Sequence, residues 1–313
     1  MAGDRSPLQG GVLRPAATAT GPVVEIACDE SGFSGTNLLH PTMPVITHAS
    51  VGLGPDEAVD VITTLRARFG LSPHELKSGR LLRRPHAADA QRWLLTALRG
   101  RAHVHVVDKE LFLATRVVDL LLAEPSYTAG TRLATATRPA ALALHRAGRA
   151  AGADWTAFLA AFAELARGRR RPPRTVERFF QARDALARHP VGAEAGAVLD
   201  ALDPDRVRAL LARLERDDRS IPPPLEPLLP ALAETVLAWS AGHRRVLVTH
   251  DEQSALTADR LARLQHALAD DSGWSPFAGL TMADSRDDPR VQLADLLAGI
   301  ARRSPPPAPV RHR

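Results

Sequence analysis

The chain has 313 residues, of which 45% are hydrophobic and 24% are charged, so it can bury a sizeable core in one large or two smaller domains. This composition excludes wholesale disorder, and no apolar run approaches the roughly 20 residues that a membrane helix needs. The formal charge of +5 is a mild basic bias, compatible with a nucleic-acid partner without requiring one. We therefore expect a globular protein with no membrane-spanning segment.

The single cysteine, Cys28, leaves no internal disulfide and excludes a zinc site built from several cysteines. Residues 1–21 mix Gly, Pro, Ala and Thr and contain no continuous apolar segment of the signal-peptide type. We therefore expect a flexible N-terminal extension over 1–21 and a cytoplasmic location in a reducing compartment.

The first structural element predicted is a buried central strand that begins at Val23. Its apolar run ends in two acids, a hydroxyl and a glycine, namely Asp29, Glu30, Ser31 and Gly32. Carboxylates at the carboxyl end of such a strand would lie at the sheet edge, where open α/β sheets place their ligands. The alternative is an acidic turn that merely ends an ordinary strand.

From residue 45 the periodicity alternates between strand and helix. It predicts a second strand antiparallel to the first at 45–53, a helix at 56–69 that Pro55 begins, a polar segment at 72–79, a helix at 87–98 and a strand at 103–108. His103 and His105 would share one face of that last strand. They are either a metal pair or part of a half-exposed strand face.

The next stretch is rich in Ala, Leu and Arg and predicts a large all-helical insertion over about 111–241 beside the sheet. Two further strands and two helices follow, at 244–250, 255–269, 277–282 and 289–302. The first of these strands ends in Asp251. Residues 304–313 form a proline-rich tail.

The final helix carries an acid close to its apolar face. That face is formed by Leu293, Leu296, Leu297 and Ile300. Gln292, Asp295 and Gly299 form a neighbouring stripe, and Gly299 leaves room for another group. Burying the carboxylate of Asp295 is costly unless it is paired with an opposite charge, hydrogen-bonded or bound to a metal. A purely structural bond to a backbone group or an arginine is the alternative.

Three acidic points therefore recur at strand ends or on a core-facing helix, namely Asp29 with Glu30, Asp251 and Asp295. Gathered carboxylates repel one another unless a cation neutralises them, and Mg²⁺ or Mn²⁺ favours oxygen ligands of this type. Such a site can activate water against a phosphodiester. The sequence has only two lysines, Lys77 and Lys109. Lys77 could bind the scissile phosphate or offset charge in the transition state.

Several short motifs occur together in a characteristic order. They are Asp29-Glu30-Ser31-Gly32, Glu75-Leu76-Lys77, the strand-end Lys109, Asp251, Asp284-Ser285 and Gln292-Leu293-Ala294-Asp295-Leu296-Leu297-Ala298-Gly299. Over about residues 23–303 the chain resembles the family called domain of unknown function 3800. That family is similar to the ribonuclease H-like superfamily, whose enzymes use carboxylates and divalent metal to cut or move nucleic-acid strands.

The resemblance implies a ribonuclease H-like mixed β-sheet flanked by helices, over residues 22–303. It implies Asp29 as the central metal ligand with Asp251 and Asp295, and Glu30 and Glu75 as further candidate ligands. Lys77, Lys109 and Gln292 would contact phosphate or orient other groups. The chain departs from ribonuclease H in its first helix, which offers only Asp56, Glu57 and Asp60 near its start in place of the expected glutamate.

The prediction is a nuclease or phosphodiesterase that uses Mg²⁺ or Mn²⁺ and acts on DNA or RNA. The competing hypothesis is a non-catalytic module of the same fold that binds nucleic acid or protein through arginine-rich helices. Convergence of the three aspartates around one metal would favour the enzyme, whereas their separation would favour the binder. A P-loop ATPase is excluded because its phosphate loop is absent, and Gly32-Phe33-Ser34-Gly35 does not form the elbow of a serine hydrolase.

Overall fold

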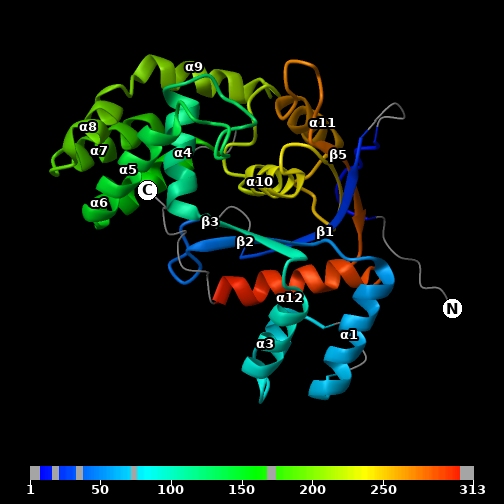
Figure 1. Cartoon of the computed structure of the whole chain (residues 1–313). Coiled ribbons are helices and arrows are strands. Elements are labelled where there is room, and N and C mark those ends of the chain that lie inside the picture. The colour runs from blue at the N-terminus through cyan, green and yellow to red at the C-terminus, as the bar shows by residue number, and fades with distance from the viewer. Residues whose placement is uncertain (1–7, 16–20, 33–37, 72–75, 168–173, 304–313) are drawn as a thin grey trace. The chain divides into compact units, whose positions relative to one another are not determined.

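A computed structural model of the protein describes residues 8–15, 21–32, 38–71, 76–167 and 174–303. In these residues the fold is α/β, with a five-stranded mixed sheet in the order β3-β2-β1-β4-β5 and helices beside it (Figure 1). The chain divides into two compact units. The sheet unit comprises 1–33, 45–106 and 231–313, and the helical unit comprises 34–44 and 107–230.

The strands are β1 (Val23–Ser31), β2 (Val45–Val51), β3 (Ala102–Asp108), β4 (Arg245–Asp251) and β5 (Phe277–Ala283). β1 is the central strand, antiparallel to β2 and parallel to β4, and β4 is parallel to β5. The prediction that the second strand is antiparallel to the first is therefore confirmed.

The first strand continues through the acids that we expected to follow it. Asp29, Glu30 and Ser31 all pair with β2, opposite Ala49, His48 and Thr47. Pairing with a neighbouring strand, and not the end of the apolar run, sets the strand's length. Because side chains alternate along a strand, Asp29 and Glu30 project from opposite faces of the sheet.

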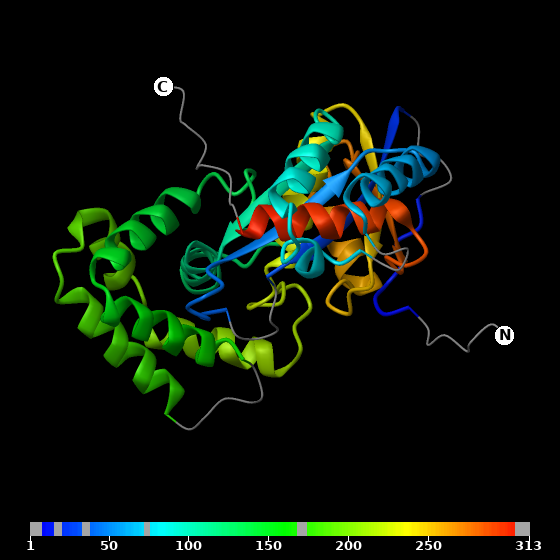
Figure 2. The ribbon, with the colours of Figure 1, turned by 90° about the horizontal axis from the view of Figure 1, so that it is seen from below.

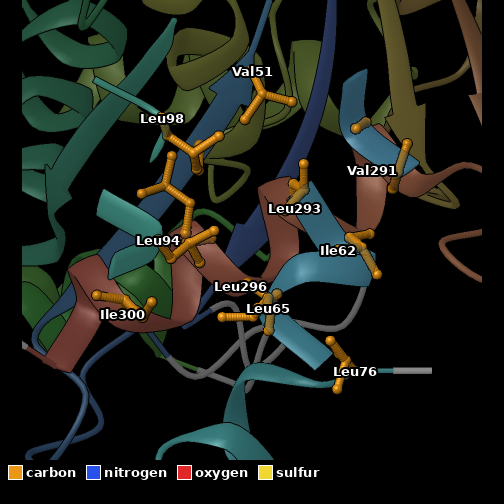
Figure 3. Close-up of a cluster of buried hydrophobic side chains, with 14 of the residues drawn as sticks. Val51, Ile62, Leu65, Leu76, Leu94, Leu98, Val291, Leu293, Leu296 and Ile300 are labelled. Carbon is orange, nitrogen blue, oxygen red and sulfur yellow. The ribbon is translucent and has the colours of Figure 1, made fainter. Parts of the chain in front are cut away.

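Helix α12 (Pro289–Arg303) packs across β1 and β2 on one face of the sheet, together with α1 (Pro55–Phe69), α2 (Ser78–Leu81) and α3 (Ala87–Ala97) (Figures 1 and 2). The four apolar positions predicted on α12 are all buried. With Val51, Leu65 and Leu94 they belong to the cluster drawn in Figure 3. Apolar residues three and four apart on α12 thus meet apolar residues from β2, α1 and α3 in one core.

The other face of the sheet is covered by α10 (Leu228–Ser240) and α11 (Ala258–Ala267). Two polar contacts join β2 to α10. His48 Nδ1 lies 2.8 Å from Thr235 Oγ1, and Trp239 Nε1 donates a hydrogen bond of 2.8 Å to Ser50 Oγ. β2 therefore presents Thr47, Ala49 and Val51 to α12 and the residues between them to α10.

The helical unit contains α4 (Lys109–Leu121), α5 (Arg138–Ala150), α6 (Ala153–Leu165), α7 (Thr175–Ala187), α8 (Gly192–Asp200) and α9 (Pro204–Glu215). The first of these helices begins at Lys109, just before the stretch of about 111–241 predicted to be helical. Its core includes an aromatic cluster of Trp155, Phe158, Phe162 and Phe179. Arg116 and Asp119 form a buried ion pair, and Arg116 also donates to the backbone oxygens of Pro222 and Pro224. Within the described residues no helix is long and apolar enough to cross a membrane.

Leu94 and Leu95 are adjacent on α3 but differ sharply in burial, with exposures of 0% and 47%. Replacing Leu94 by Ala should lower the free energy of unfolding by about 2–5 kcal/mol, because it removes buried area and leaves a cavity in the cluster of Figure 3. Leu95→Ala is the matched control and should change it by less than about 0.5 kcal/mol. Chemical denaturation measures both, and equal losses would contradict this packing of α3.

Candidate functional site: carboxylates on the α12 face of the sheet

Asp29 is the buried carboxylate at the centre of the site. It lies opposite Ala49 on the face of β1 that α12 covers, and only 6% of it is exposed. The backbone N–H of Glu30 donates a hydrogen bond of 2.7 Å to Asp29 Oδ1. The central position of β1 thus removes this carboxylate from water while leaving it few partners.

Asp251 is the last residue of β4 and lies on the same face. The preceding residue, His250, pairs with Cys28, so one further step along both parallel strands brings Asp251 beside Asp29. The backbone N–H of Ser285, which follows β5, donates to Asp251 Oδ1 at 3.2 Å. Parallel strands therefore deliver two of the three predicted aspartates to one edge.

Asp295 reaches the site from α12. It accepts hydrogen bonds from the backbone N–H and the hydroxyl of Ser78, at 3.2 and 3.4 Å. Gly299, one turn further along α12, accommodates Ser78, since a Cβ at this glycine would lie 2.2 Å from Ser78 Cβ. The predicted space beside Gly299 is thus filled by the residue that holds Asp295.

All three aspartates have raised pKa values. Burial raises the pKa of Asp29 well above its ordinary value, and the charges of Glu30, Asp251 and Asp295 raise it further. Burial likewise raises the pKa of Asp251 and of Asp295, while Lys77 opposes the rise in both. The group therefore favours bound protons or a cation over three free carboxylates.

Lys77 is the cation that acts on two of these acids. Its ammonium donates a hydrogen bond of 3.1 Å to Ser285 Oγ. An open pocket of about 300 Å³ lies beside it, lined by Lys77, Asp251, Glu252, Asp284, Ser285 and Arg286. Arg286 forms an ion pair with Asp284. Lys77 and Asp251 line the same pocket. This pocket has room for a charged group next to Asp251.

Two further predicted residues have partners within the protein. Glu30 lies on the opposite face from Asp29, where its carboxylate accepts a hydrogen bond of 2.6 Å from Gln253. Gln292 is buried, donates to the backbone oxygen of Ser285 at 3.2 Å and accepts from Arg66 at 3.3 Å. Both therefore support neighbouring groups in this structure.

Of the remaining candidates, the structure describes Lys109, His103 and His105 but not Glu75. Lys109 begins α4 in the helical unit, where its side chain is buried, and Asp108 caps the same helix by accepting from the N–H groups of Glu110 and Leu111. Glu75 lies outside the described residues. His103 and His105 are half-buried in β3.

A buried histidine pair under the site escaped the sequence analysis. Nε2 of His48 lies 3.1 Å from Nε2 of His250, and His250 Nδ1 lies 2.9 Å from the backbone oxygen of Asp251. A carbonyl only accepts, so His250 Nδ1 carries its proton, His48 Nε2–H donates to His250, and the hydroxyl of Thr235 donates to His48. Burial, with a smaller effect of His250, lowers the pKa of His48, which favours a neutral His48 ring. The signal in the sequence was a histidine within each of two otherwise largely apolar strands, His48 in β2 and His250 in β4.

The donors fit a divalent cation in kind and charge, because they are carboxylate oxygens that raise one another's pKa. Their positions fit less closely. Within the described ranges, no three His, Cys, Asp or Glu side chains are gathered so that they could hold one metal ion. The site therefore has the charge that a cation would neutralise but not a preformed cage of three ligands.

Comparison with known proteins adds no relative to this description. No family model, no curated protein and no solved structure matches the chain.

Asp29→Asn should stabilise the protein. Because the folded state raises the pKa of Asp29, ionising this residue costs stability as the pH rises above about 3.8, and asparagine has no charge to bury. We expect a gain of about 0.5–2 kcal/mol at pH 7 in the presence of chelator, which shrinks toward zero below pH 4. Thermal unfolding at both pH values measures it, and a loss at pH 7 would contradict the strained carboxylate.

Gly299→Ala should destabilise the protein by about 1–3 kcal/mol, because the new methyl group would overlap Ser78. At an open helical position the same change stabilises by about 0.5–1 kcal/mol. Ser78→Gly removes the overlapping atoms, so the double variant should lose less than the sum of the two single variants. Strict additivity in denaturation experiments would show that the two residues do not touch.

Proposed function

We propose that this protein is a nuclease or phosphodiesterase that acts on DNA or RNA with Mg²⁺ or Mn²⁺ at the Asp29 site. The observation that carries the proposal is the position of buried Asp29 on β1 beside Asp251 of the parallel strand β4, on the sheet face that α12 covers, where the charges of Asp251 and Asp295 both act on Asp29. Carboxylates from three elements that repel one another favour a bound cation, and such groups are candidates for functional sites.

We extend the proposal to the family. The strand order β3-β2-β1-β4-β5, with β1 antiparallel to β2 and parallel to β4, supports a ribonuclease H-like sheet, because the resemblance implies a mixed sheet. The proposed metal ligands of that resemblance are Asp29 within β1, Asp251 at the end of β4 and Asp295 on α12.

In this mechanism the chain's own residues hold charge and position the substrate. A bound divalent ion would supply Lewis-acid activation of a phosphodiester. Asp29, Asp251 and Asp295 would hold it, and Glu30 and Glu75 remain candidate ligands. Lys77 stands beside Asp251 at the pocket, where its ammonium can bind a phosphate oxygen and stabilise charge in the transition state. Lys109 and Gln292 remain proposed substrate contacts.

A non-catalytic module that binds nucleic acid or a protein is the second candidate. Two observations favour it. The aspartates do not form a preformed cage in the described residues, and α5 of the helical unit exposes Arg138 and Arg146, which suit phosphate contacts. Such a module would bind nucleic acid without needing Asp29.

The test is cleavage of single- and double-stranded DNA and RNA by the purified chain with Mg²⁺ or Mn²⁺. We expect Asp29→Asn and Asp295→Asn each to lower the rate by about 100-fold or more, because each removes ligand charge and keeps the side chain's size. Chelator should abolish cleavage in the wild type.

Asp259→Asn is the matched control, since Asp259 is a carboxylate on α11 that pairs with Arg263 away from the site. It should leave the cleavage rate unchanged. If the wild type cuts none of the four substrates, and Asp29→Asn binds them as tightly as the wild type does, the enzyme proposal fails and the binding module is the better account.

A further inference from the structure

Ser285 joins three elements of the site through three different atoms. Its backbone N–H donates to Asp251 Oδ1 at 3.2 Å, its hydroxyl oxygen accepts from Lys77 Nζ at 3.1 Å, and its backbone oxygen accepts from Gln292 Nε2 at 3.2 Å. The residue is 4% exposed. A short, buried side chain at this turn can hold its partners with little loss of side-chain entropy.

Ser285 is itself held from the core side. Gln292 of α12 donates to it, and the other end of the Gln292 amide accepts from Arg66 of α1 at 3.3 Å. Gln292 is buried, so its position depends on the packing of α1 against α12. A continuous series of hydrogen bonds thus runs from Arg66 through Gln292 to Ser285.

Lys77 needs such a partner because its side chain is long and flexible. Its ammonium interacts electrostatically with two carboxylates on different elements, Asp251 and Asp295. An ammonium on such a stem can sample positions near either acid or in the open pocket. The hydroxyl of Ser285 selects one of these positions, beside Asp251.

We propose that Ser285 is a positioning residue that fixes the Lys77 ammonium beside Asp251, and that Gln292 and Arg66 orient Ser285. Ser285 acts through Lys77 and does not itself react. The catalytic meaning of this role rests on the proposed function, but the position of Lys77 can be measured without any activity.

The chain offers an unusually clean spectroscopic test because it contains only two lysines, Lys77 and Lys109. In the full chain grown with ¹³C-labelled lysine, the two Hε protons of an immobilised side chain have distinct chemical shifts. We expect Ser285→Ala to merge the Hε signals of Lys77 and to leave those of the buried Lys109 unchanged. Lys77→Arg assigns the signals.

The matched control is Ser275→Ala. Ser275 is also a buried serine next to β5, at the opposite end of the strand, and its hydroxyl donates to the backbone oxygen of Gln265. This control should leave the Lys77 signals separate, and Ser285→Thr, which retains a hydroxyl, should keep them separate as well. If Ser285→Ala does not fold, Ser285→Cys replaces it, since a thiol is a weak acceptor. Unchanged Lys77 signals in the folded variant would overturn the proposal.

Kinetics form the second arm. Ser285→Ala should lower kcat/KM by about 10- to 100-fold, and it should have no further effect in a Lys77→Met background because its role passes through the lysine. If Ser285→Ala lowers kcat/KM by the same factor in the Lys77→Met background as in the wild type, the positioning role is overturned. If the wild type cleaves nothing, the proposed function fails by itself, and the lysine spectrum still decides whether Ser285 positions Lys77.

Discussion

The repulsion between carboxylates on one face of the sheet is the constraint on which the rest of the site depends. β1 is central, so Asp29 cannot turn toward water without breaking pairing on both sides. Each neighbouring acid is restrained by a different donor, with Ser285 on Asp251 and Ser78 on Asp295. These hydrogen bonds stabilise the ionised forms but do not cancel the cost of burial, because both acids still have raised pKa values.

The two faces of the sheet divide the polar groups by role. On the α12 face, Asp29 and Asp251 leave charge unbalanced. On the α10 face, His48 and His250 form a hydrogen-bonded chain that begins at the hydroxyl of Thr235 and ends at the backbone oxygen of Asp251. Buried polar groups whose hydrogen bonds are all satisfied make a core rigid. Buried charge without an opposite charge favours the binding of a ligand that neutralises it. The contrast supports the α12 face as the place of the proposed site.

The sequence predicted the elements and their periodicity more reliably than side-chain partners. The antiparallel second strand and the apolar face of α12 followed from patterns of two and of three to four residues. The end of β1 did not, because pairing with β2 carries the strand through Asp29 to Ser31. Gln292 was expected to contact substrate, yet a long-range bond from Arg66 engages it, and no local pattern encodes a contact across 226 positions.

The contacts of Lys77 and Ser78 have a consequence for how the chain can vary in length. These adjacent residues hold opposite sides of the site, Lys77 beside Ser285 and Ser78 on Asp295. Their Cα atoms are separated by the fixed span of one trans peptide, about 3.8 Å. The dipeptide is therefore a spacer between the β5 turn and α12. A substitution at either position changes one contact. A residue inserted between them would displace Lys77 from Ser285 or Ser78 from Asp295, because the two contacts could no longer form together.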